Sequence, residues 1–169
     1  MKMEIICGDI RIDNLSSFLS EIKKISDELD VIIQAMDSMK IASREHLDFA
    51  IKKAFSAFNE GRNVARDPGL EIMRYAAGKR QIGDSFCIGL NEGENKGVFV
   101  IAGKEENIRS AVQIVKKMLS SSKELLYTSQ KRDPLMETFG ITEEEVNAAG
   151  EDRIPDLVIE RVALVDILR

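Results

Sequence analysis

The chain has 169 residues, of which 44% are hydrophobic and 31% charged, and its 24 basic and 29 acidic side chains give a net charge of −5 at pH 7. This composition predicts one globular domain over residues 1–169, large enough to fold around its own core without a disulfide or a metal. The sequence shows neither a leader-like start nor an apolar run near the roughly 18 residues of a membrane span, so we expect a cytoplasmic protein that does not enter a membrane.

The first sixty residues predict two strands and two helices in alternation. Residues 1–12 and 31–37 are rich in apolar and β-branched side chains and are expected to form strands. Asp13 or Asn14 can cap a helix that runs to about Leu29. Ser43 can cap a second helix, which Gly61 ends.

The next stretch is basic although the chain is acidic. Residues 61–82 carry five basic side chains against two acidic ones, and the basic residues are Arg62, Arg66, Arg74, Lys79 and Arg80. Asp67 and Pro68 form a typical helix start, and Gly78 is a typical residue just past a helix end. We therefore expect a short helix over residues 68–77 with basic residues at its entry and exit.

The second half of the chain completes an α+β pattern. We expect a hairpin from residues 85–91 and 97–103, a helix over 105–119, a short strand over 124–127, a helix opened by Asp133 and Pro134, and a helix capped by Thr142. Strands separated by helices, with one hairpin, indicate a small mixed or antiparallel sheet packed with several helices.

The last segment, residues 157–168, is apolar at nine of its twelve positions. On a helix, Val158, Val162 and Val165 share one side, while leucines and isoleucines cover the others. Two interpretations stay open. The segment is a buried C-terminal helix or strand, or it is an apolar helix that shows its second face to a partner.

Residues suited to catalysis are few. The single histidine, His46, falls in the first turn of a predicted helix, where a surface or capping role is expected. Cys7 and Cys87 lie in apolar runs typical of buried, reduced thiols. The sequence holds no metal-binding motif, and its glycines at 89, 93 and 97 fit a hairpin turn better than a phosphate loop. We therefore expect no enzymatic activity, no cofactor and no metal site.

The basic stretch has two interpretations on composition alone. It is a solvated surface, or its arginines bind phosphate groups through paired hydrogen bonds. In the second case Tyr75 would be available to stack on a nucleobase, although an aromatic residue at helical spacing more often belongs to the core.

Three motifs occur in order along the chain: GRNVARDPGLEIMRYAAGKRQI at 61–82, FGITEEEV at 139–146 and VIERVALVDILR at 158–169. Together they resemble the small kinase-binding subunit of the KEOPS complex, the PRPK-binding protein (TPRKB) family, in its archaeal type. The resemblance runs from about residue 46 to the end of the chain.

This resemblance implies a non-catalytic subunit of the complex that makes the threonylcarbamoyl modification on the adenosine beside the anticodon of many tRNAs. An ATPase-fold subunit carries out the transfer in that complex. The small subunit binds an atypical PRPK-like kinase, supports its activity and helps to recruit tRNA, including its 3′ CCA tail.

The resemblance gives the two unusual features a role without assigning individual contacts, so the candidate residues are those of the basic stretch and of the apolar terminal segment. RNA-binding residues would be Arg62, Arg66, Arg74, Lys79 and Arg80, and kinase-binding residues would be Leu157, Val158, Arg161, Leu164 and Leu168. Eukaryotic members are less basic at the positions of Lys79 and Arg80, so the RNA role carries over to these two less directly. Two other classes of function stay open, which are a free-standing RNA-binding module and a small enzyme that uses Cys87 or His46.

Overall fold

The computed structural model describes residues 1–167, and contacts within the chain divide it into two units. The sheet unit comprises residues 1–38 and 89–124, and the helical unit comprises residues 39–88 and the chain from 125 onward. The α+β class is confirmed, with three strands and eight α-helices among the described residues. A single domain over residues 1–169 stays a prediction. Within the described part of the chain, no helix combines the length and the apolar character needed to cross a membrane.

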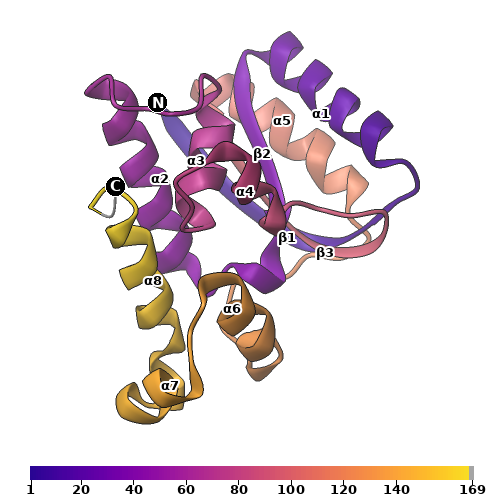
Figure 1. The fold of residues 1–169 in the computed structure, drawn as a ribbon. Helices are drawn as coiled ribbons and strands as arrows, with labels where there is room; N and C mark the ends of the chain where they lie inside the picture. The colour runs from indigo at the N-terminus through magenta and orange to yellow at the C-terminus, as the bar shows by residue number, and fades with distance from the viewer. Residues whose placement is uncertain (168–169) are drawn as a thin grey trace. The chain divides into compact units, whose positions relative to one another are not determined.

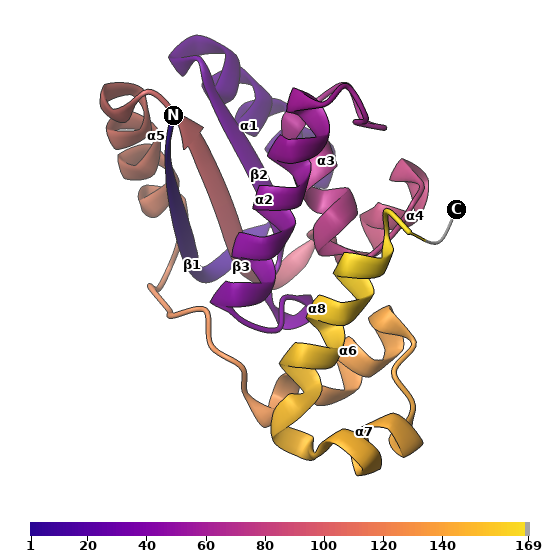
Figure 2. The same cartoon turned by 90° about the vertical axis from the view of Figure 1, so that its left-hand side faces the viewer.

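The sheet unit is built on three antiparallel strands, β1 (Lys2–Ile12), β2 (Val31–Asp37) and β3 (Gly93–Gly103), in the order β1-β3-β2. Residues 97–102 of β3 are all buried, as expected for a strand paired on both edges. Two helices, α1 (Leu15–Leu29) and α5 (Glu105–Met118), lie together on one face of this sheet (Figures 1 and 2).

The core of the sheet unit lies between the sheet and these two helices. Phe99 and Ile101 of β3 point to the same face because side chains alternate along a strand. They meet Ile22 of α1 and Ile108 of α5 in one apolar cluster. Burying a side chain of this size contributes about 1.5–3 kcal/mol to stability, so the cluster is enough to hold the helices on the sheet.

The predicted hairpin is wrong. Residues 85–91 form no strand; they contain the end of α4 (Ile82–Ser85) and a 3-10 turn over Phe86–Ile88. Both edges of β3 are already taken by β1 and β2, so no edge remains for a hairpin partner. A distant residue contacts the turn instead, since Lys40 Nζ donates to the carbonyl oxygen of Cys87 at 2.6 Å.

A strand over residues 124–127 was also expected and does not form. The segment just before it runs along β1, where the N–H groups of Ser120 and Lys123 donate to the carbonyl oxygens of Asp9 and Cys7 at 2.9 and 3.0 Å. Only an isolated bridge results. The approach requires Gly8, since a Cβ atom there would lie 2.0 Å from the carbonyl oxygen of Ser121.

The helical unit holds the remaining helices, which are α2 (Arg44–Asn59), α3 (Pro68–Ala76), α4, α6 (Arg132–Phe139), α7 (Glu143–Ala149) and α8 (Ile154–Leu164). Figure 2 shows α8 beside α2, with α6 and α7 near its first turns. The predicted caps are confirmed for α2, α3 and α7. Their Ser43, Asp67 and Thr142 side chains accept backbone N–H groups of the first turn.

The structure decides in part between the two interpretations of the last segment. It is a helix, and Val158, Val162 and Val165 on its predicted side are all buried. It is shorter than expected, because it ends at Leu164 rather than near residue 168. Leu168 lies outside the described residues.

Candidate functional site

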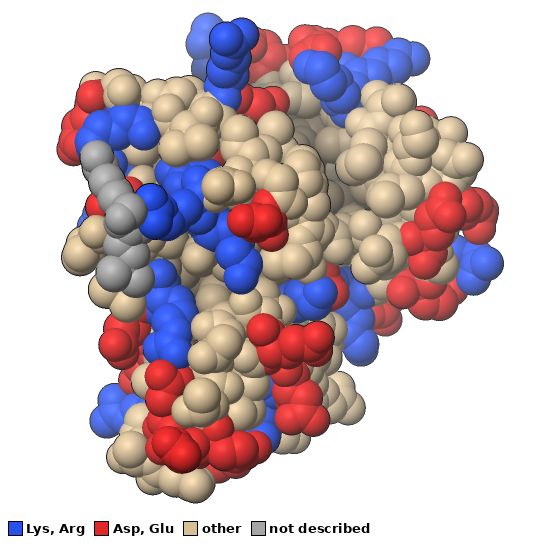
Figure 3. Space-filling model, in the orientation of Figure 1, with Lys and Arg blue, Asp and Glu red and all other residues tan. Residues whose placement is uncertain are grey.

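The basic stretch folds into α3 and the two loops that flank it. The entry loop, residues 60–67, carries Arg62 and Arg66, and the exit loop, residues 77–81, carries Lys79 and Arg80. Arg74 belongs to α3 itself. Figure 3 shows Lys and Arg side chains gathered on the face of the helical unit that carries α3 and α4. The structure therefore brings the two ends of the basic stretch to one face.

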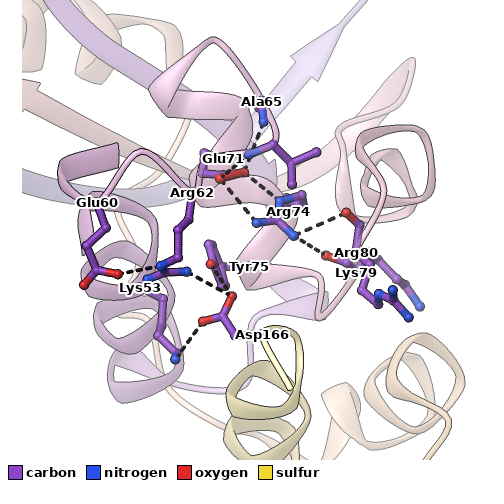
Figure 4. Close-up of polar contacts among 11 residues, drawn as sticks. Lys53, Glu60, Arg62, Ala65, Glu71, Arg74, Tyr75, Lys79, Arg80 and Asp166 are labelled. Carbon is purple, nitrogen blue, oxygen red and sulfur yellow. Dashed lines mark hydrogen bonds and ion pairs between the residues drawn. The ribbon is translucent and has the colours of Figure 1, made fainter. Parts of the chain in front are cut away.

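Glu71 and Arg74 form a buried ion pair one turn apart on α3 (Figure 4). Arg74 Nε donates to Glu71 Oε1 at 2.6 Å and its Nη2 donates to Oε2 at 3.2 Å. Only 3% of Arg74 and 0% of Glu71 is exposed. Burial acts to lower the pKa of Arg74, but the hydrogen bond and the charge of Glu71 outweigh it, so that pKa is raised. The guanidinium stays charged and has little surface for a ligand.

This pair also holds both loops. The Glu71 carboxylate accepts the backbone N–H groups of Val64 and Ala65 in the entry loop at 2.9 and 3.3 Å. On the other side, Arg74 Nη1 donates to two carbonyl oxygens of the exit loop, at residues 79 and 80, at 3.3 Å each. Arg74 is thus a residue that positions the basic loops, and a direct contact between its side chain and RNA would require the pair with Glu71 to open.

A pocket of about 740 Å³ lies between the two loops and the turn after α8. Its lining contains four basic and two acidic side chains, so its local charge is positive. The lining residues are Arg62, Val64, Arg74, Gly78, Lys79, Arg80, Gln81, Asp84, Val165 and Asp166. Arg66 is exposed on the entry loop but is not part of this lining. Four of the five predicted RNA-binding residues therefore share one cavity.

These cations differ in how far they are engaged within the protein. Arg62 pairs with Glu60 at its Nε atom, and Lys79 Nζ donates to the carbonyl oxygen of Thr138 at 3.0 Å. Within residues 1–167, the side chains of Arg66 and Arg80 contact no hydrogen-bond or ion-pair partner, and both residues are exposed. Arg66 and Arg80 are therefore the cations most available to an anionic ligand.

Asp166, two residues past the end of α8, closes one wall of the pocket (Figure 4). Tyr75 Oη donates to its Oδ1 at 2.6 Å, Lys53 Nζ donates to its Oδ2 at 2.9 Å, and Arg62 Nη1 lies 3.6 Å from Oδ1. Burial raises the pKa of this carboxyl group, but the hydrogen bonds and charges of its three partners outweigh that effect and lower the pKa. The resulting anion ties the turn after α8 to α2 and α3. We call these four residues the Asp166 cluster.

Tyr75 is fully buried, and its hydroxyl group is engaged by Asp166. The suggestion that Tyr75 stacks on a nucleobase is therefore wrong, and the alternative, a core aromatic residue, holds. Its ring also lies 4.5 Å from the guanidinium carbon of Arg74, which adds to the packing around the buried pair.

His46 and Cys87, named as alternative catalytic residues, are not brought into this pocket. The expected surface position of His46 is wrong, since it is fully buried. Its Nδ1 accepts the N–H of Ala42 at 2.9 Å, and its Nε2 donates to the carbonyl oxygen of Ala76 at 2.8 Å. Both ring nitrogens are therefore engaged. Burial also lowers the pKa of His46 to about 4, so the ring is neutral near pH 7.

The cysteines also differ from the expectation that both are buried. Cys7 is buried, but Cys87 is exposed because it lies in the 3-10 turn that replaced the expected strand. Among the described residues, no group of three or more His, Cys, Asp or Glu side chains is placed to hold a metal ion.

The predicted kinase-binding residues of α8 fall into two groups. Val158 is fully buried with Leu135 and Ile154, and Leu157 packs against the same apolar cluster. Arg161 donates to the Glu145 carboxylate at 2.7 Å, and this contact links α8 to α7. Val158 and Arg161 therefore support the fold of the helical unit, whereas Leu157 keeps part of its surface exposed.

The C-terminal turn of α8 offers more surface. Leu164 is half-buried, and Ile167, which the sequence did not single out individually, is 71% exposed.

The structure adds several residues that sequence reasoning missed, namely Glu71, Asp84, Lys53 and Asp166. Glu71 and Arg74 lie three residues apart on a predicted helix, and this spacing alone could have indicated an ion pair. Lys53 and Asp166 are separated by 113 residues, and no local signal links them.

Comparison with known proteins matches the chain to a family over residues 11–166, which includes most of both units and every residue of the pocket. No curated protein matches the chain. The family match begins at residue 11, well before residue 46 where the motif resemblance begins, and it covers far more than half of the 169 residues. The chain therefore belongs to the family described as kinase binding protein CGI-121.

Proposed function

We propose that this protein is a non-catalytic, cytoplasmic subunit, of the archaeal type, of a KEOPS complex that makes threonylcarbamoyladenosine in tRNA. In this role it binds an atypical PRPK-like kinase and helps to recruit tRNA by its 3′ CCA tail, and its link to the ATPase-fold subunit runs through the kinase. The match to a family of kinase-binding proteins over residues 11–166 carries the proposal.

The pocket between the basic loops supports the RNA part of the proposal. Arginine and lysine side chains bind phosphate oxygens by charge-assisted hydrogen bonds, and a concave basic surface raises the local concentration of a polyanion. In this proposal Arg62, Arg66, Lys79 and Arg80 contact the phosphates. Arg74 acts through the loops that it holds, because its own side chain is buried against Glu71.

The end of α8 supports the kinase part. Its buried side is used by the core of the helical unit, whereas Leu164 and Ile167 retain exposed apolar surface. Apolar side chains at the centre of an interface supply much of the binding free energy. We assign the kinase contact to this turn of the chain.

Two other functions are weighed against this one. An enzyme that uses His46 would need a free ring nitrogen, yet both nitrogens are engaged. A free-standing RNA-binding module would have the same pocket but no kinase partner. Co-purification with the isolated kinase separates the module from the complex subunit, and turnover of ATP or of a threonylcarbamoyl donor by the protein alone would contradict a non-catalytic role.

The test of the RNA proposal is fluorescence anisotropy with intact and CCA-trimmed tRNA across a salt series. With three or four phosphates neutralised by single-strand-like contacts, log K should fall with log salt at a slope of roughly −2 to −3. Removal of the CCA tail should reduce affinity, whereas removal of the anticodon arm should not.

The test variant replaces Arg66 and Arg80, the two basic residues whose side chains contact no partner within residues 1–167. Arg66→Glu with Arg80→Glu should weaken binding at least about tenfold and flatten the slope by roughly 1.4, since each lost contact contributes about 0.7. Lys117→Glu is the control, because Lys117 is an exposed residue of α5 in the sheet unit and undergoes the same charge change. Equal affinity of the double variant and the wild type would refute RNA binding at this pocket.

A further inference from the structure

Arg62 belongs to the pocket and to the Asp166 cluster at the same time. Its side chain lines the pocket and is 35% exposed, and its Nη1 lies 3.6 Å from Asp166 Oδ1. The Asp166 side chain is 22% exposed and lines the same cavity. An anion that enters the pocket therefore meets a cation and a carboxylate that are already paired with each other.

Asp166 also holds the turn after α8, together with the buried side chain of Val165. Among the described residues, two backbone hydrogen bonds continue the helix past Leu164, from Val165 N–H to the Val162 carbonyl at 3.2 Å and from Ile167 N–H to the Leu164 carbonyl at 3.0 Å. Side-chain contacts from α2, α3 and the entry loop reach this turn at Asp166. The exposed Ile167 follows directly. Loss of contacts at Asp166 is therefore transmitted to the surface that α8 offers to a partner.

We propose that Asp166 couples the pocket to the end of α8, so that an RNA phosphate bound in the pocket weakens the binding of the kinase at that turn. This inference rests on the proposed function. A phosphate attracts Arg62 and repels the Asp166 carboxylate, so it favours the state in which their pair is open and the turn is loosened. A partner that packs on the ordered turn favours the closed pair. Two ligands that favour different states of one element lower each other's affinity. The factor by which RNA lowers kinase affinity equals the factor by which the kinase lowers RNA affinity.

The experiment measures the affinity of the full chain for the isolated kinase by calorimetry, with and without a saturating short RNA that ends in CCA and is too short to bridge to the kinase. We expect the RNA to weaken kinase binding about threefold to tenfold, and the kinase to weaken RNA binding by the same factor. A single exposed ion pair and one repulsive contact account for a change of this size.

Two variants identify the residue responsible. Asp166→Asn keeps an acceptor for Tyr75 but removes the charge, so the factor should fall to about one and RNA affinity should rise severalfold. Lys53→Met removes a partner of Asp166 that does not line the pocket, and it should retain the factor. If Lys53→Met abolishes the factor as Asp166→Asn does, general loosening of the turn explains it and the inference is overturned.

Amide hydrogen exchange of the protein without kinase gives a second readout. Added RNA should speed exchange at the Val165 and Ile167 amides in the wild type but not in Asp166→Asn. Binding of RNA with no change at these amides, or a wild-type kinase affinity that RNA leaves unchanged or strengthens, overturns the inference while leaving the proposed RNA and kinase binding intact. If RNA alone does not bind, the proposed RNA function is refuted and the coupling is overturned with it.

Discussion

Replacement of Arg74 by Met removes the charge that compensates the buried carboxylate of Glu71. The Glu71 side chain has no exposed surface, and without Arg74 it retains only the N–H groups of Val64 and Ala65. Two carbonyl oxygens of the exit loop lose their donor as well. Breaking a buried ion pair by removing one partner typically costs about 3–5 kcal/mol. We expect Arg74→Met to lose a free energy of unfolding in this range.

The assay is urea denaturation followed by far-UV circular dichroism, together with a thermal scan. For a chain of this size each kcal/mol corresponds to roughly 2–4 °C in Tm, so Arg74→Met should melt about 10 °C lower. Arg66→Met is the matched control, because Arg66 is exposed and its side chain has no partner within residues 1–167. Its stability should change by less than about 0.5 kcal/mol.

A second replacement separates loss of the pair from loss of packing. Glu71→Gln added to Arg74→Met removes the uncompensated charge while leaving an oxygen that accepts the entry-loop N–H groups. The double variant should therefore be more stable than Arg74→Met alone, which is the signature of two coupled residues. A loss below about 1 kcal/mol for Arg74→Met, or a further loss in the double variant, would refute the positioning role of the pair.

Two further predictions concern the helical unit. The unfolded chain takes up a proton at His46 near pH 6.5, whereas the folded protein keeps the ring neutral down to about 4, so stability is full above pH 6.5 and falls by about 1.4 kcal/mol per pH unit between these values. In His46→Gln this part of the pH dependence, measured by urea denaturation, should be absent. Leu164→Glu and Ile167→Glu should each reduce kinase affinity at least about tenfold, since a buried apolar side chain contributes about 1.5–3 kcal/mol. Leu19→Glu, at an exposed apolar position of α1, is the control. If a folded Ile167→Glu variant binds the kinase with wild-type affinity, Ile167 is not in the interface.

Local signals predicted much of the fold. Ser43, Asp67 and Thr142 were identified as caps because an N-cap needs only the N–H groups of the next few residues. The predicted hairpin failed because it paired 97–103 with its neighbour in sequence, whereas the actual partners of β3 are distant segments. Ile88 and Leu90 alternate with more exposed residues as they would in a strand, but β3 pairs with β1 and β2, which lie more than fifty residues earlier in the chain. Sequence periodicity does not record which edge is free.

The candidate site was also predicted only in part. Charge counting located the basic stretch, but it treated Arg74 and Arg66 as equivalent. The structure separates them, since Arg74 is buried against Glu71 and Arg66 is exposed without a partner in the described chain. The role of Asp166 depends on contacts with residues far away in sequence, of which Lys53 is one. Burial and long-range pairing decide whether a cation binds a ligand or holds the fold, and neither is visible in composition.

This acidic protein can have a positive pocket because several of its carboxylates are neutralised by arginines outside the pocket. Residues 133–169 hold ten acidic and three basic side chains, and several of these carboxylates are paired with nearby arginines. Arg132 binds Glu143 and Glu151, and Arg161 binds Glu145. The hydrogen bonds from these arginines lower the pKa of Glu143 and of Glu145. A neutralised pair projects little field beyond a Debye length of about 8–10 Å at physiological salt. The exposed cations of the entry and exit loops therefore act on a polyanion through their own local potential, and a net charge of −5 for the whole chain does not oppose RNA binding at the pocket.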